Sequence, residues 1–181
     1  MDTTGRVIYV GTFSKSLFPS LRLGYLLAPP DLVETFERLT STFLPGVPTS
    51  LQAGTAEFID EGFFAAHIRR MRRIYAERHQ ALCDAAKQHL DGLLNVVPTE
   101  SGLHTIGHLP PQMSESAVAE AAKARTIAVS PIARFCLQPM GTNGLVLGFG
   151  SIGPAEIRAG VEGLSEVLES LVQADRRSAA L

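Results

Sequence analysis

Two apolar runs near the start of the chain enclose a loop with a single lysine, and this arrangement limits the folds that are open to the sequence. The runs predict buried strands over residues 6–10 and 22–28, and from residue 7 to residue 30 the only charged side chains are those of Lys15 and Arg22. Because a lysine between two buried strands loses water, its neutral amine is favoured, which is the form that attacks a carbonyl. The stretch therefore predicts an amine able to form a Schiff base.

The residues around this lysine resemble a known segment. The run VIYVGTFSKSLFPSLRLGYLLAPPDLV has Thr12 three positions before Lys15, Ser14 directly before it, and Leu-x-Pro followed by an arginine within the next seven positions. It resembles the cofactor-lysine segment of fold-type I pyridoxal-phosphate enzymes, and most of all the aminotransferase-like domain of MocR-type regulators in the GntR superfamily. A surface lysine on a loop is the alternative, which the apolar surroundings disfavour.

The resemblance implies a cofactor and the residues that hold it. In the resembled family the lysine forms a Schiff base with pyridoxal 5'-phosphate, so Lys15 is the implied catalytic and cofactor-binding residue. Thr12, Ser14 and Arg22 are implied to bind the cofactor phosphate, and a forked guanidinium suits that group. The alternatives are turn formation by the two hydroxyl groups and a salt bridge elsewhere for Arg22.

The last expected strand, residues 144–149, departs from the pattern of ordinary aminotransferases. Those enzymes carry an arginine in this strand for the substrate α-carboxylate, whereas this chain has Val146 near the place and no arginine in the strand. The departure puts ordinary α-amino-acid transamination in doubt. Arg134 is the nearest substitute for binding a carboxylate, and a surface arginine at a strand end is an equal alternative.

Hydrophobic spacing predicts alternating helices and short strands along the chain. Helices are expected over residues 31–43, 49–60, 63–90, 114–125 and 154–174, strands over 94–98, 102–107, 126–130 and 144–149, and a frayed tail from residue 175. The predicted class is α/β, as the C-terminal part of a fold-type I pyridoxal-phosphate-dependent transferase. Residues 1–60 would end the large domain and carry the lysine, and residues 61–181 would form the small α+β domain.

Composition and residue spacing exclude several other classes of function. The net charge of −2 over 181 residues gives no electrostatic footprint for nucleic acid, and no apolar run reaches the ~18 residues of a membrane span. The two cysteines, Cys83 and Cys136, lack a paired spacing and favour a reducing cytoplasm. His104 and His108 lie four residues apart, but on a strand that a proline pair follows we expect structural histidines and no metal.

The resemblance also implies partners, and it suggests three hypotheses. It implies an amino acid or other amino compound as effector or substrate, a homodimer, and contact with DNA only through an N-terminal winged-helix domain outside these residues. We expect a truncated family member that exposes apolar surface and associates when alone. The hypotheses are an effector-sensing domain of a regulator, a fragment of a stand-alone aminotransferase, and a non-catalytic remnant that folds only with a partner.

Overall fold

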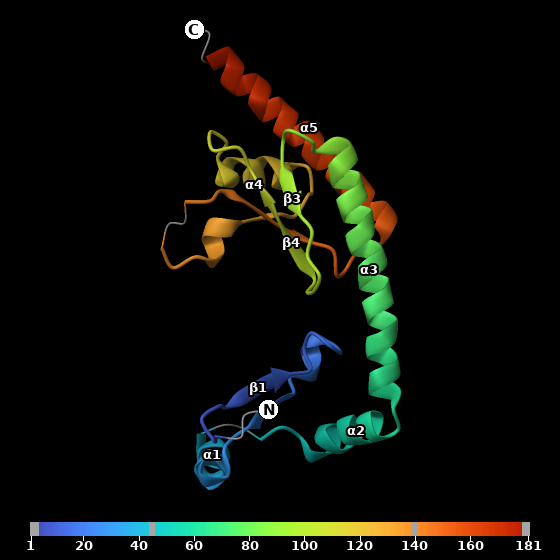
Figure 1. The fold of residues 1–181 in the computed structure, drawn as a ribbon, viewed down its shortest axis with the longest axis vertical. Coiled ribbons are helices and arrows are strands. Elements are labelled where there is room, and N and C mark those ends of the chain that lie inside the picture. The colour runs from blue at the N-terminus through green and yellow to red at the C-terminus, as the bar shows by residue number, and fades with distance from the viewer. Residues whose placement is uncertain (1–3, 44–45, 139–140, 179–181) are drawn as a thin grey trace. The chain divides into compact units, whose positions relative to one another are not determined.

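The computed structural model describes residues 4–43, 46–138 and 141–178 of an α/β chain (Figure 1). The chain divides into two compact units, Met1–Arg70 (unit 1) and Met71–Leu181 (unit 2). The division falls inside α3 (Phe63–His89), which is one continuous helix. The sequence places its boundary at the glycine-containing turn before this helix instead. The assignment of the two parts to a large and a small domain stays a prediction.

Unit 1 begins with a β-hairpin that carries the predicted lysine in its loop. Strand β1 (Tyr9–Thr12) pairs antiparallel with β2 (Gly24–Leu27), with Thr12 opposite Gly24 at the loop end. A short 3-10 helix, Pro19–Leu21, lies within the loop. Helices α1 (Pro30–Phe43), α2 (Thr49–Asp60) and the first turns of α3 complete the unit.

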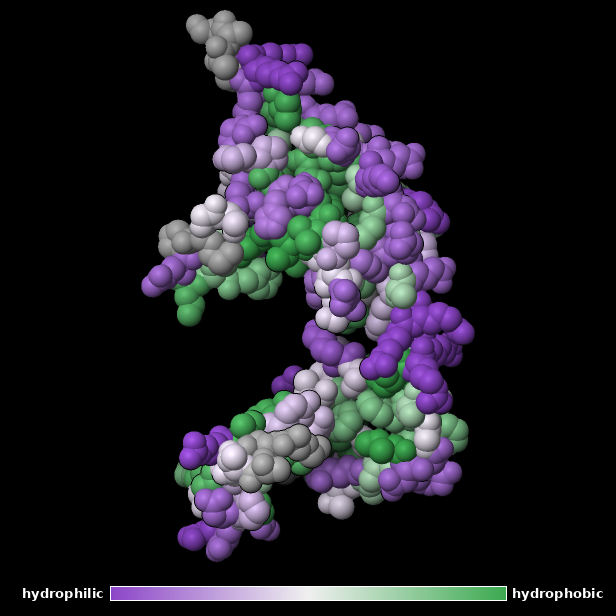
Figure 2. All heavy atoms as spheres, viewed as in Figure 1, coloured by the Kyte–Doolittle hydropathy of each residue, from purple (hydrophilic) through white to green (hydrophobic). Residues whose placement is uncertain are grey.

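The hairpin is exposed, which corrects the prediction of two buried strands. Tyr9, Val10 and Leu27 keep 54%, 70% and 53% of their surface accessible, and hydrophobic residues are visible on the surface in Figure 2. Burial of an apolar run requires a second layer, and a ribbon of two short strands does not supply one. The expectation that this chain exposes apolar surface is confirmed.

Unit 2 is built on an antiparallel sheet with the strand order β3-β4-β6-β5. The strands are β3 (Asn95–Val97), β4 (His104–His108), β6 (Gly144–Gly148) and β5 (Ser130–Pro131). The unit also contains the helices α4 (Glu115–Ala124) and α5 (Pro154–Ser178). Between β5 and β6 lies a second 3-10 helix, Ile132–Phe135. The remainder of α3 also belongs to this unit.

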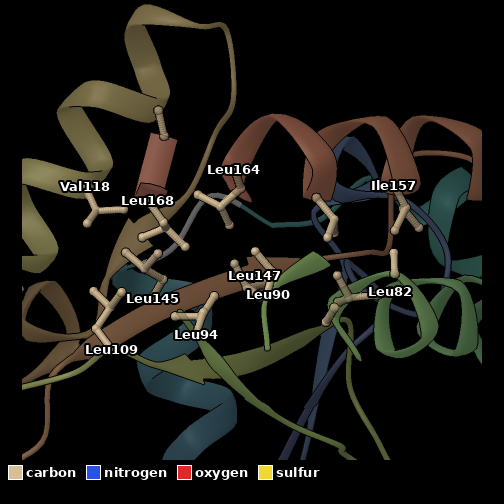
Figure 3. Close-up of a cluster of buried hydrophobic side chains, with 14 of the residues drawn as sticks. Leu82, Leu90, Leu94, Leu109, Val118, Leu145, Leu147, Ile157, Leu164 and Leu168 are labelled. Atoms are coloured by element: carbon tan, nitrogen blue, oxygen red, sulfur yellow. The ribbon is translucent and has the colours of Figure 1, made fainter. Parts of the chain in front are cut away.

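A single hydrophobic cluster joins the helices of unit 2 to its sheet. In Figure 3 Leu164 and Leu168 of α5 lie over Leu145 and Leu147 of β6, and Leu90, directly after α3, lies beside them. Leu90, Leu145 and Leu168 are fully buried. Each fully buried leucine contributes about 1.5–3 kcal/mol relative to an exposed one, so this cluster is the main stabilising feature of the unit.

Two predicted elements of unit 2 have a boundary that differs from the structure by more than two residues. Strand β5 covers only Ser130–Pro131 and not residues 126–130. Thr126 has a positive φ of 63°, which breaks an extended run, and Pro131 has no N–H to extend the ladder. Helix α5 continues to Ser178, beyond the predicted end at 174, because no glycine or proline lies in residues 174–178 and basic residues in its last turn oppose the helix dipole.

Candidate functional site

Lys15 lies in a tight turn directly after β1. The backbone N–H of Leu17 donates to the Phe13 carbonyl at 2.8 Å, which closes one turn of chain around the lysine. The Lys15 side chain is exposed, and it forms no hydrogen bond or ion pair with any residue that the structure describes. The expected desolvation between buried strands is therefore absent from this chain, and the amine is accessible to a ligand.

The base of this loop is fixed by backbone and aromatic contacts. The Phe13 N–H donates to the Leu23 carbonyl at 3.0 Å, and Leu23 is buried. The Phe13 ring lies 5.5 Å from the Tyr25 ring and 5.8 Å, edge to face, from the Phe64 ring of α3. These contacts hold the lysine turn against the start of α3 within unit 1.

Helix α3 supplies a second anchor that the sequence reasoning missed. The Nε2–H of His67 donates to the Ser16 carbonyl at 2.9 Å, one residue after the lysine. Because a carbonyl only accepts, this bond assigns the proton to Nε2. His67 lies three residues after Phe64 on the same helix face, and this spacing is the signal that could have identified it as part of the site.

Gly11 and Tyr25 shape the strand that leads into the turn. A Cβ at Gly11 would overlap Cζ of Tyr25, so the ring packs directly over the glycine backbone. A side-chain hydrogen bond with Tyr9 raises the pKa of Tyr25, and burial and the charge of Tyr9 add to the shift. The glycine of the GTFSK run is thus explained by the ring that covers it.

Thr12 and Ser14 form a hydroxyl pair before the lysine. The Thr12 Oγ1 accepts a hydrogen bond from the Ser14 N–H at 3.1 Å, and its proton goes to the Ser14 Oγ at 3.0 Å or the Leu23 carbonyl at 3.4 Å. The turn-forming alternative for Thr12 is therefore present. The Ser14 hydroxyl proton has no acceptor in the described part of the chain, which leaves it available to an anion.

Arg22 closes the same loop in an unusual backbone conformation. Its φ of 50° is left-handed, which costs about 1–2 kcal/mol for a residue other than glycine. The guanidinium is exposed and unpaired within the described ranges. The loop from Thr12 to Arg22 thus carries unpaired donors on Ser14, Lys15 and Arg22, a donor set that fits a phosphate group.

Arg134 belongs to unit 2 and is not part of this loop. It lies in the 3-10 helix after β5, is exposed, and lines a shallow groove of about 630 Å³ with Glu120 and Lys123 of α4. Its guanidinium makes no ion pair with any described residue. The structure supplies a free cationic group in unit 2 and a separate set of donors in unit 1.

The remaining predicted groups do not form a site in the described part of the chain. His104 and His108 lie at the two ends of β4, and no group of three or more His, Cys, Asp or Glu side chains there could hold a metal. Cys83 and Cys136 are half-buried free thiols, and burial, with the charge of Asp84, raises the pKa of Cys83. No helix within the described ranges is long and apolar enough to cross a membrane.

The sequence matches the family described as aminotransferase class I and II over residues 1–164. It is 36% identical to the probable rhizopine catabolism regulatory protein MocR of Rhizobium meliloti over 94% of this chain and 35% of that protein. It is 32% identical to the uncharacterized HTH-type transcriptional regulator YhdI of Bacillus subtilis over 95% of this chain and 37% of that protein. The chain spans about a third of the length of these relatives.

The fold is similar to that of solved aminotransferases. A multiple substrate aminotransferase from Thermococcus profundus superposes with a TM-score of 0.86 and 28% identity over 96% of this chain and 43% of that chain. The α-aminoadipate aminotransferase LysN of Thermus thermophilus was solved in complex with N-(5'-phosphopyridoxyl)-L-leucine. It superposes with a TM-score of 0.83 and 27% identity over 93% of this chain and 43% of that chain. The predicted likeness to part of a fold-type I transferase is confirmed.

Proposed function

The chain belongs to the class I and II aminotransferase family, and from this premise we propose that it is the pyridoxal-phosphate-binding, effector-sensing part of a MocR/GntR-type transcriptional regulator. The similarity to MocR and YhdI along nearly all of this chain supports the regulator assignment. The exposed, unpaired donors that one loop carries on Ser14, Lys15 and Arg22 are the observation that supports the cofactor assignment. DNA contact and a homodimer are proposed for the whole regulator.

Each residue of the loop has a role in this proposal. Lys15 binds the cofactor covalently through Nζ, which is accessible and unpaired in the described part of the chain. The Ser14 hydroxyl and the Arg22 guanidinium donate to the cofactor phosphate. Thr12 holds Ser14 in place through the hydrogen bonds described above and contributes its own hydroxyl when it turns toward the phosphate.

The amino compound enters as a competitor of the lysine. Pyridoxal phosphate, when bound, supplies a carbonyl carbon for amines and an electron sink. With the cofactor bound, an effector with a free amino group would compete with Lys15 for that carbonyl carbon, and Lys15 Nζ would be the group able to hold a proton. Arg134 is proposed to bind the effector carboxylate, because a guanidinium donates to both carboxylate oxygens.

Borohydride trapping tests the cofactor assignment. The purified chain is incubated with pyridoxal phosphate, its visible absorbance is recorded, and the reduced protein is digested and analysed by mass spectrometry. We expect a visible band and a cofactor adduct on the peptide that contains Lys15. Both should disappear in Lys15→Ala and persist in Lys87→Ala, which removes an exposed lysine from the last turn of α3. Equal labelling of Lys15→Ala would contradict the assignment.

A stand-alone aminotransferase is the second candidate. The likeness to solved aminotransferases at 27–28% identity favours it, whereas the lack of an arginine in β6 counts against it. The two candidates differ in product: an aminotransferase releases a keto acid from an amino acid, and an effector-sensing domain binds the amino acid without turnover. The third hypothesis, a remnant that folds only with a partner, predicts no adduct on Lys15 at all.

A further inference from the structure

The carboxylate of Glu115 joins two segments of unit 2. Glu115 is the first residue of α4, and its Oε1 accepts a hydrogen bond from the Ala133 N–H at 3.1 Å. Its Oε2 accepts a hydrogen bond from the Gly144 N–H at 3.0 Å. Ala133 directly precedes Arg134, and Gly144 is the first residue of β6. The Glu115 side chain therefore links the backbone directly before Arg134 to the first residue of β6.

We infer that Glu115 is a positioning residue that orients Arg134 for a carboxylate ligand, an inference that rests on the proposed function of Arg134. Packing of the buried Ile132 side chain anchors the 3-10 helix from its apolar side. The pairing of β5 with β6 holds the residues directly before this helix, and the hydrogen bond from the Ala133 N–H to Glu115 adds a contact one residue before Arg134. Arg134 itself has no partner in the described residues, so its orientation comes from its backbone.

The arrangement needs a carboxylate with the length of glutamate. An ionised carboxylate accepts at both oxygens, and here each oxygen receives one backbone donor. In Glu115→Gln one oxygen becomes an NH₂ group, which would face an N–H donor without a bond. Glu115→Asp keeps the charge and both acceptors but is one methylene shorter, so it cannot reach both donors.

Glu120 supplies a matched control on the same helix. It is exposed, lines the same groove as Arg134, and makes no hydrogen bond with any described residue. Glu120→Gln therefore changes the charge of α4 by the same amount as Glu115→Gln without removing a backbone contact. A difference between the two variants reports the hydrogen bonds and not the charge.

Two NMR measurements on the full chain test the inference. Amide hydrogen exchange at Ala133 and Gly144 should accelerate about tenfold at one or both sites in Glu115→Gln and Glu115→Asp and remain unchanged in Glu120→Gln. Titration with acetate, followed by the Arg134 side-chain Nε–H signal, should show about fivefold weaker binding in both Glu115 variants, while Arg134→Ala abolishes it. Unchanged exchange, or unchanged acetate affinity with accelerated exchange, would overturn the positioning role.

The test separates this inference from the proposed function. If acetate does not shift the Arg134 signal in the unmodified chain, the carboxylate role of Arg134 and the positioning role of Glu115 both fail. The assignment of Lys15 as the cofactor-binding residue is then tested by borohydride trapping alone. If trapping fails but acetate binds in the expected order, Glu115 still positions a carboxylate site, and the cofactor proposal is the part that is wrong.

Discussion

In unit 2 the apolar side chains converge on one core, whereas in unit 1 many of those in β1, β2 and α1 face solvent. Among the described residues, the buried hydrophobic side chains of unit 1 are Leu21 and Leu23, at the end of the lysine loop. Helix α1 has no buried residue, and its Phe43 is 73% exposed. Unit 2 is therefore ordered by a hydrophobic core, whereas unit 1 is ordered by other local contacts.

The difference shows how the candidate cofactor loop is held. It lies in the unit with little core, and its geometry comes from backbone hydrogen bonds, an aromatic group around Phe13, and His67. Changes in such a loop alter the site more than the free energy of unfolding. The reverse holds for the core of unit 2, where Leu145 is fully buried and contributes to the stability of its own unit.

The largest expected effect comes from truncating the core of unit 2. Leu145 is fully buried in β6, and Leu145→Ala should lower the free energy of unfolding by about 2–5 kcal/mol, because it removes transfer free energy and leaves a cavity. Leu26→Ala is the matched change in unit 1, where Leu26 is 41% exposed, and it should cost less than about 1 kcal/mol. Denaturant unfolding followed by circular dichroism measures both. Equal losses would show that the comparison between the units is wrong.

Much of the fold follows from the sequence because amphipathic spacing is a local property. The stripe of Ile157, Val161, Leu164 and Leu168 predicts α5, and these side chains are buried as expected. The exposure of the hairpin could not be predicted in the same way. An apolar run such as residues 7–10 is buried only when another layer covers it, and the residues of the run do not contain that information.

In the candidate site, too, the features that follow from local sequence differ from those that depend on the rest of the fold. Thr12, Ser14, Lys15 and Arg22 lie within eleven residues of one another, so a motif is enough to predict that they belong to the end of β1 and the loop between β1 and β2. His67 is far from Ser16 along the chain and meets it only through the fold. Glu115 was also missed, because an acidic residue in the first turn of a helix is ordinarily explained by the helix dipole.

An intermediate effect is expected at Arg22, where the site and the stability of unit 1 can be separated. Arg22→Gly removes the guanidinium and weakens pyridoxal-phosphate binding about tenfold or more, as expected for a lost charge-assisted hydrogen bond. The same change relieves the left-handed backbone, φ 50°, while glycine adds entropy to the unfolded chain, so the net change in stability should stay within about 1 kcal/mol.

Arg22→Lys is the control for this prediction. It keeps the positive charge and the strained backbone but loses the fork of donors, so its affinity should fall between those of the unmodified chain and Arg22→Gly. Absorbance titration with pyridoxal phosphate and denaturant unfolding give the two quantities. If Arg22→Gly binds the cofactor as tightly as the unmodified chain, the phosphate role of Arg22 is wrong.

The smallest effect concerns the tyrosine pair beside the lysine turn. The rings of Tyr9 and Tyr25 are 6.0 Å apart, and their hydrogen bond raises the pKa of Tyr25 above its ordinary value of 10.0. The folded chain then holds this proton more tightly than the unfolded chain. The contribution to stability is therefore complete below the ordinary pKa and is lost as the pH rises through the raised one.

Tyr9→Phe should return the pKa of Tyr25 toward 10.0, because it removes both the hydrogen bond and the neighbouring charge. Ultraviolet absorbance of tyrosinate against pH measures the shift. Tyr75→Phe, which removes the tyrosine of unit 2, should leave the titration of Tyr25 unchanged and simplify its assignment, since the chain has three tyrosines. A Tyr25 titration that is the same with and without Tyr9 would mean that the contact between Tyr9 and Tyr25 does not order unit 1 in solution. The turn that carries Lys15 would then depend on its backbone hydrogen bonds and on the contacts of Phe13 and His67.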